Sequence, residues 1–118
     1  MTKPLALIIE DDPTLREIFE LTLESDFETE TIADGESAVT RLAEVLPALV
    51  ILDLHLPGLS GAEILTRIRG DERLAKIKVI LATADNQQAS LIEGKADMVL
   101  LKPISPAQLR ELARRLSA

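Results

Sequence analysis

Short apolar segments alternate with longer amphipathic segments along this chain. Five short runs are bounded by polar or turn residues, and each is either apolar throughout or alternates between apolar and polar residues. They indicate five strands: Leu5–Ile9, Glu28–Ile32, Leu49–Leu52, Val79–Ala82 and Met98–Leu101. Leu49–Leu52 is wholly apolar, which is typical of a strand buried on both faces, whereas Glu28–Ile32 alternates like a half-buried edge strand. Strands that alternate with helices in this way predict βαβ units and a mainly parallel sheet.

Helix signals lie between and after the strands. We expect helices after Asp12, after Asp34 with Pro47 as the stop, from Ser60 to Gly70, within Asp85–Gly94 and from Pro106. Asp12 before Pro13 is typical of a capped helix start, because Pro fits the first helical position. The fourth helix is expected to be short and loosely held, since only Ala89, Leu91 and Ile92 are available to anchor it.

Composition narrows the class of protein. The chain has 118 residues, the size of one domain, and its 47% hydrophobic content argues against disorder. The 13 basic and 20 acidic residues give a net charge of −7, which argues against direct nucleic-acid binding. The chain lacks cysteine and has a single histidine, His55, which excludes thiolate and multi-histidine zinc sites. Without a secretory signal or a long apolar run, we expect a cytoplasmic protein with no membrane contact.

Polar residues follow four of the predicted strands directly: the acids Glu10, Asp11 and Asp12, then Asp53, Thr83 and Lys102. Because the carboxyl ends of parallel strands meet at one edge of the sheet, we expect these groups to lie close together. An acid at position 53, behind a buried strand and near other acids, would suffer repulsion and desolvation unless a cation neutralised the cluster. Mg²⁺ accepts one or two carboxylates together with phosphate oxygens, so the pattern favours a magnesium and phosphoryl site.

Each of these residues also has an ordinary structural interpretation. Asp12 is better explained as a helix cap, Thr83 is a common residue type in strands, and Lys102 before Pro103 could be a solvated turn. Asp53 is harder to explain in this way, because no Gly or Asn beside it indicates a turn. The combination at four strand ends therefore carries the prediction, rather than any one residue.

The chain resembles the receiver domain of two-component response regulators across residues 4–117. The resemblance rests on "LIIEDDP", "LVILDLHLPGLSG", "VILATA" and "LLKPISPAQL", whose order and spacing agree with the family pattern. It implies a flavodoxin-like α/β fold: a doubly wound, five-stranded parallel sheet in the order 2-1-3-4-5 with five helices. It also implies that residues 1–118 form a single receiver domain, either a stand-alone protein of the chemotaxis type or a piece of a longer regulator.

The resemblance assigns roles to the strand-end residues. Asp53 would accept a phosphoryl group from a sensor histidine kinase or a phosphotransfer protein, with Thr83 and Lys102 binding the phosphoryl oxygens. Mg²⁺ or Mn²⁺ would be held by Glu10, Asp11, Asp53 and the backbone carbonyl of His55, whose side chain is expected to be exposed. Pro57 and Gly61 would shape the loop after the acceptor. The module would be a phosphoprotein with at most self-phosphorylation and self-dephosphorylation activity, not a turnover enzyme.

Two residues depart from the family pattern on the usual output surface. Val99 stands where many receivers have Tyr or Phe, and Ile104 follows Pro103 where Phe is common. The stretch from Thr83 to Lys102 is also shorter than the family pattern by roughly one helical turn. We therefore expect phosphorylation to be retained while its readout is atypical.

Two other functions remain as alternatives. One is a receiver-like interaction module that works without phosphorylation, which only the output residues favour. The other is a phosphatase with an aspartyl nucleophile, but His55 stands where such enzymes place a second acid. Arg110, Arg114 and Arg115 could support self-association through the last helix, although they also complement the helix dipole.

Overall fold

A five-stranded parallel sheet in the order β2-β1-β3-β4-β5 forms the centre of the protein, as predicted. The strands are β1 (Leu5–Ile9), β2 (Glu28–Ile32), β3 (Leu49–Leu52), β4 (Lys78–Thr83) and β5 (Met98–Leu101). The computed structural model describes residues 2–117, apart from the side chain of Glu93. All four strand pairs are parallel, so the carboxyl ends of the strands share one edge of the sheet.

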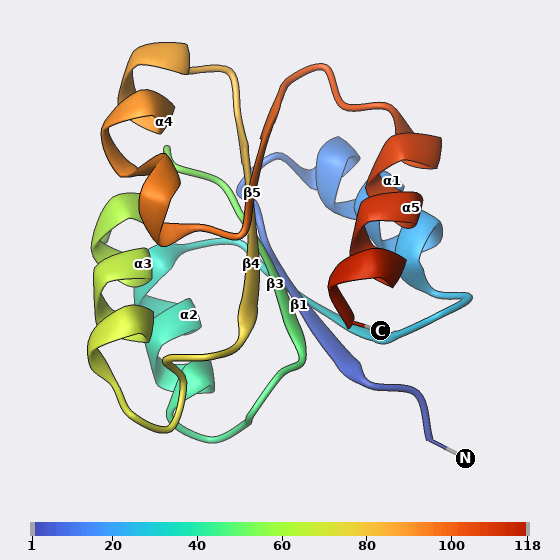
Figure 1. Ribbon diagram of the computed structural model, residues 1–118, viewed down its shortest axis with the longest axis horizontal. Helices are drawn as coiled ribbons and strands as arrows, with labels where there is room; N and C mark the ends of the chain where they lie inside the picture. Colours follow the sequence, from blue (N-terminus) through green and yellow to red (C-terminus); the bar gives the residue numbers. More distant parts are fainter. Residues whose placement is uncertain (1, 118) are drawn as a thin grey trace.

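Helices cover both faces of the sheet (Figure 1). They are α1 (Pro13–Leu23), α2 (Gly35–Leu42), α3 (Gly61–Gly70), α4 (Asn86–Ile92), the 3₁₀ turn η1 (Glu93–Lys95) and α5 (Pro106–Ser117). Helices α1 and α5 lie on one face, and α2, α3 and α4 lie on the other. Within residues 2–117, no helix is long and apolar enough to cross a membrane.

The apolar central strands explain why the sheet needs two helical layers. Neighbouring residues of a strand point to opposite faces, so a continuous apolar run must be covered on both sides. In β1, Leu7 and Ile9 pack into the core beneath α2, α3 and α4. Ala6 and Ile8 pack on the other face, with Phe19 of α1 and the inner side of α5. This packing fixes β1, β3 and β4, the three central strands, and with them the positions of the residues at their carboxyl ends.

The second helix is shorter than predicted. We expected it to continue to Pro47, but α2 ends at Leu42, and Leu46 is 61% exposed rather than buried. The guanidinium of Arg73, from the connection after α3, donates hydrogen bonds to the carbonyl oxygens of Leu42 and Val45. This distant residue satisfies carbonyl groups that a continuing helix would have used, which a sequence window cannot reveal.

The fourth helix is short, as predicted, but its anchoring differs from the prediction. Ala89 is buried, whereas Leu91 is 80% exposed and contributes little to the core. The 3₁₀ turn after α4 is held by Arg69 of α3, whose Nε donates to the carbonyl oxygen of Lys95 at 2.7 Å. The same guanidinium pairs with Asp97 at 2.9 Å, just before β5. Polar contacts on the C-terminal side of α4 therefore help to hold this helix, which few apolar residues anchor.

Candidate functional site

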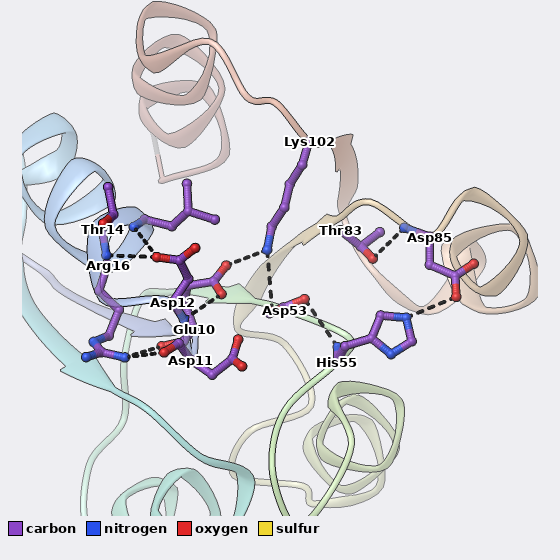
Figure 2. A network of polar contacts seen from close by, with 11 residues as sticks. Glu10, Asp11, Asp12, Thr14, Arg16, Asp53, His55, Thr83, Asp85 and Lys102 are labelled. Atoms are coloured by element: carbon purple, nitrogen blue, oxygen red, sulfur yellow. Dashed lines mark hydrogen bonds and ion pairs between the residues drawn. The ribbon is translucent and has the colours of Figure 1, made fainter.

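The predicted strand-end residues lie together at the carboxyl edge of the sheet (Figure 2). Glu10 and Asp11 directly follow β1, Asp53 directly follows β3, and Lys102 directly follows β5. Thr83 is the last residue of β4. Because β3 lies between β1 and β4, Asp53 stands between the acids that follow β1 and the hydroxyl of Thr83.

Three carboxylates form the centre of this site. One oxygen from each of Glu10, Asp11 and Asp53 lies within 4.8 Å of the others. Glu10 is 1% exposed and Asp53 is 5% exposed, while Asp11 faces solvent. Such close carboxylates repel one another, particularly where burial removes water, and a hard cation with oxygen ligands relieves that repulsion.

Lys102 supplies the positive charge that faces the cluster. Its Nζ lies 2.7 Å from Glu10 Oε1 and 3.4 Å from Asp53 Oδ2. Burial alone would lower the pKa of the Lys102 ammonium, but the contacts with Glu10 and Asp53 outweigh it and raise that pKa. Lys102 is therefore charged, and its ammonium group contacts the carboxylates that follow β1 and β3.

Burial of the Glu10 carboxylate carries an electrostatic penalty. Burial raises the pKa of Glu10 to about 7, despite the opposing contacts from Lys102 and from the backbone N–H of Asp12, which donates to Oε2 at 3.2 Å. The charge of Asp53 raises the pKa further. Glu10 Oε1 is buried and has no hydrogen bond of good geometry, although it contacts Lys102 as an ion pair. This carboxylate oxygen is the clearest sign that another positive group fits here.

Asp12 does not join the cluster and instead caps α1. Its Oδ1 accepts hydrogen bonds from the backbone N–H groups of Thr14 at 2.9 Å and Leu15 at 3.3 Å. This is the helix-cap role that the sequence favoured for Asp12. The cap fixes the start of α1 immediately after the two acids that belong to the site.

The hydroxyl of Thr83 and the ring of His55 both contact Asp85, which precedes α4. The backbone N–H of Asp85 donates to Thr83 Oγ1 at 3.0 Å, and Asp85 Oδ2 lies 3.0 Å from His55 Nε2. The His55 side chain is 65% exposed, as expected. Its backbone N–H donates to Asp53 Oδ1 at 3.2 Å. A continuous set of polar contacts therefore connects Asp53 to the start of α4.

The loop after Asp53 is packed tightly against α3. A Cβ at Gly61 would overlap the carbonyl oxygen of Asp53 and lie 2.7 Å from the Cα of Leu54. Gly58 has a φ of 77°, a backbone conformation that residues other than glycine rarely adopt. Only glycine at position 61 lets the helix start directly beneath the backbone of Asp53.

Two polar residues of this region were not found in the sequence. Arg16 donates to the carbonyl oxygens of Glu10 and Asp11, and Asp85 joins the His55 loop to α4. An arginine and an aspartate near helix starts are common surface residues, so the sequence held no signal for these contacts.

The family model described as "Response regulator receiver domain" matches residues 6–114. The chain belongs to this family. Receiver domains of the family are signalling modules of two-component systems. The match spans all five strands and most of α5, and it agrees with the strand order observed here.

Curated relatives and solved structures agree with this assignment. The chain is 36% identical over 110 residues to the phosphate regulon transcriptional regulatory protein PhoB of Rhizobium meliloti, covering 90% of this chain and 48% of that protein. It is 34% identical over 107 residues to the DNA-binding response regulator MtrA of Mycolicibacterium smegmatis, covering 87% and 46% respectively. The chain thus spans about half the length of these two relatives.

A solved receiver domain provides the structural comparison that bears most on the site. The receiver domain of a sensor histidine kinase from Pseudomonas aeruginosa PAO1 aligns with a TM-score of 0.90 and 25% identity, over 98% of each chain. Its structure is described with a magnesium ion coordinated in the active-site cleft. A BeF₃-activated DrrB receiver domain aligns with a TM-score of 0.88 and 25% identity, over 98% of this chain and 97% of that one.

Proposed function

We propose that this receiver domain accepts a phosphoryl group on Asp53 in a reaction that depends on Mg²⁺ or Mn²⁺. The donor would be a phosphohistidine on a sensor kinase or on a phosphotransfer protein. The observation that carries the proposal is the cluster of Glu10, Asp11 and Asp53 within 4.8 Å, faced by the ammonium of Lys102. This set of groups suits a divalent cation and a phosphoryl group together.

The residues at the site fit a divalent cation. Asp11 and Asp53 would hold it through carboxylate oxygens, Glu10 would support it, and the backbone carbonyl of His55 would complete the protein ligands. The buried and incompletely bonded Oε1 of Glu10 supports this fit. A bound cation would neutralise the carboxylates and the oxygens of the incoming phosphoryl group.

The chain's own side chains account for the transfer. An oxygen of Asp53 forms the new P–O bond as the P–N bond of the phosphohistidine breaks, and the imidazole leaves with the electron pair of that bond. Lys102, already 3.4 Å from Asp53 Oδ2, pairs with one phosphoryl oxygen. The hydroxyl of Thr83, which now accepts from the N–H of Asp85, can turn to donate to another.

Phosphorylation would change the surface around α4 and β5. The acyl phosphate adds about −1.5 to −2 of charge beside Thr83 and Lys102. Movement of the Thr83 hydroxyl would remove its bond to the N–H of Asp85 and so release the start of α4. Val99 is partly buried in the core here, without the aromatic ring of many receivers, so the readout would be atypical.

We also propose the wider setting of the domain. Residues 1–118 would act as one receiver that works in the cytoplasm with a histidine kinase or phosphotransfer protein as partner. The net charge of −7 argues against direct nucleic-acid binding by this part, although two of the matched relatives are transcriptional or DNA-binding regulators. Its catalysis would be limited to forming and losing its own phosphoryl group.

Incubation with acetyl phosphate and Mg²⁺, followed by intact mass spectrometry, tests the proposal. The wild-type chain should gain one phosphoryl group with Mg²⁺ and none with EDTA. Asp53→Asn should gain none, whereas Asp12→Asn is the matched control, because the Asp12 side chain caps α1 and its backbone contact with Glu10 survives the substitution. A folded wild-type chain that stays unmodified would overturn the proposal and favour an interaction module that works without phosphorylation.

A further inference from the structure

We propose that Arg16 is a positioning residue that fixes the Glu10–Asp11 segment and thereby sets the affinity of the site for a divalent cation. This inference rests on the proposed function, because it concerns the same cation. Arg16 lies outside the carboxylate cluster, and none of its atoms is a candidate ligand. Its action is on the backbone that carries two of the ligands.

The contact joins one guanidinium nitrogen to two consecutive carbonyl groups. Nη1 of Arg16 donates to the carbonyl oxygen of Glu10 at 3.0 Å and to that of Asp11 at 2.9 Å (Figure 2). Arg16 is in the first turn and a half of α1, and its backbone N–H donates to the carbonyl of Asp12 at 2.9 Å. The rigid helix therefore holds the guanidinium against the segment between β1 and α1.

Asp11 depends on this contact more than the other acids of the cluster. Glu10 is tied by its backbone N–H to Ile32 at 3.0 Å and by its side chain to Asp12 and Lys102. Within the described residues 2–117, no hydrogen bond or ion pair restrains the Asp11 carboxylate, which faces solvent. The direction of that carboxylate is therefore set by the backbone of Asp11, and Arg16 holds the carbonyl of that same residue.

A cation site needs its ligands held in place before the cation arrives. Three carboxylates within 4.8 Å repel one another, so the exposed one tends to turn away into water when its backbone is free. A second residue that orients a metal ligand is commonly worth tenfold or more in metal affinity. We expect loss of the Arg16 contact to weaken Mg²⁺ binding about tenfold.

Titration calorimetry of the whole chain with MgCl₂ measures this effect without any phosphoryl donor. Arg16→Met removes the donors and keeps the length of the stem, and Arg16→Gln is a second variant should the first fail to fold. Arg110→Met is the matched control, since Arg110 of α5 also donates to a backbone carbonyl, that of Thr22 in α1 at 3.4 Å, away from the acids. Arg16→Lys should recover most of the affinity, because one ammonium can donate to both carbonyls.

Salt separates positioning from the direct charge effect of Arg16, whose cationic guanidinium repels Mg²⁺ and so opposes its binding. The Debye length falls from about 10 Å at about 0.1 M salt to about 3 Å at about 1 M, so a purely electrostatic effect of Arg16 would largely disappear. We expect the ratio of Kd between Arg16→Met and wild type to persist at high salt, and Arg110→Met to bind like wild type. Circular dichroism melts without metal confirm that each variant is folded.

The outcomes distinguish this inference from the function on which it rests. A wild-type chain that binds no Mg²⁺ would overturn both. A wild-type chain that binds Mg²⁺ with the same Kd as Arg16→Met and Arg16→Gln would overturn only the role of Arg16. Equal losses in Arg16→Met and Arg110→Met, or a loss that disappears at high salt, would also overturn it.

Discussion

Glu10→Gln is expected to stabilise the metal-free protein at neutral and alkaline pH. The charged Glu10 is buried at 1% exposure beside Asp53, and its pKa is raised from 4.5 to about 7. The folded state therefore holds a proton on Glu10 at pH values where the unfolded state has lost it. Stability from this group is fully present below pH 4.5 and is lost as the pH rises through about 7.

The magnitude follows from the same shift. At about 1.4 kcal/mol for each pKa unit, a pKa raised from 4.5 to about 7 costs the folded state at most about 3–4 kcal/mol above pH 7. A glutamine cannot ionise, but it has only one oxygen to offer to both the N–H of Asp12 and the ammonium of Lys102. We therefore expect Glu10→Gln to gain about 1–3 kcal/mol at pH 8 in EDTA.

Urea unfolding followed by circular dichroism at several pH values measures this difference, since the chain has no Trp or Tyr for fluorescence. The gap between Glu10→Gln and wild type should be small at pH 4.5, widen through pH 7 and narrow again when Mg²⁺ is added. Glu28→Gln is the control, because Glu28 is an exposed residue of β2, and it should change stability by less than about 0.5 kcal/mol. Parallel pH profiles of wild type and Glu10→Gln, or a less stable Glu10→Gln at pH 8, would show that the buried charge of Glu10 does not destabilise the fold.

Three further substitutions test the contacts that support the site. Asp85→Ala removes the carboxylate that caps α4 by accepting from the N–H of Gln88 at 2.9 Å. Amide hydrogen exchange should therefore become faster in α4 and stay unchanged in β1 and β3. An exchange rate in α4 equal to that of the wild type would contradict this. Arg69→Ala should lower the free energy of unfolding by about 2–3 kcal/mol, because the guanidinium of Arg69 donates four hydrogen bonds. Urea unfolding measures this change, and a change below about 0.5 kcal/mol would contradict the prediction. Gly61→Ala should destabilise the fold by about 2–4 kcal/mol, because the added Cβ would overlap the carbonyl oxygen of Asp53. The same substitution should slow phosphorylation by acetyl phosphate. A variant with the stability and the rate of the wild type would be inconsistent with the observed packing.

The positions of the strands and the acidic cluster were accessible from the sequence for a common physical reason, whereas the strand order came from the family resemblance. A central parallel strand must be apolar on both faces, so runs such as Leu49–Leu52 stand out between polar segments. The residue after each run must then lie at the same edge of the sheet. Glu10, Asp11, Asp53 and Lys102 meet there as that logic requires.

The parts that escaped prediction depend on contacts between residues distant in sequence. The end of α2 is set by Arg73, about thirty positions away, which no local pattern around Pro47 indicates. Leu91 is 80% exposed because α4 packs on the core through Ala89, which leaves Leu91 on the solvent side of the helix. Arg16 was missed because an arginine on a helix is ordinary until its carbonyl partners are known.

Chemical trapping of the acyl phosphate identifies the residue that accepts the phosphoryl group. Borohydride reduces an aspartyl phosphate to homoserine, so peptide mapping after reaction with acetyl phosphate locates the modified residue. With Mg²⁺ present, we expect homoserine at position 53 alone, and none when EDTA removes the metal. Homoserine at Asp11 or Asp12 instead, or equal labelling of Asp53 in EDTA, would contradict it.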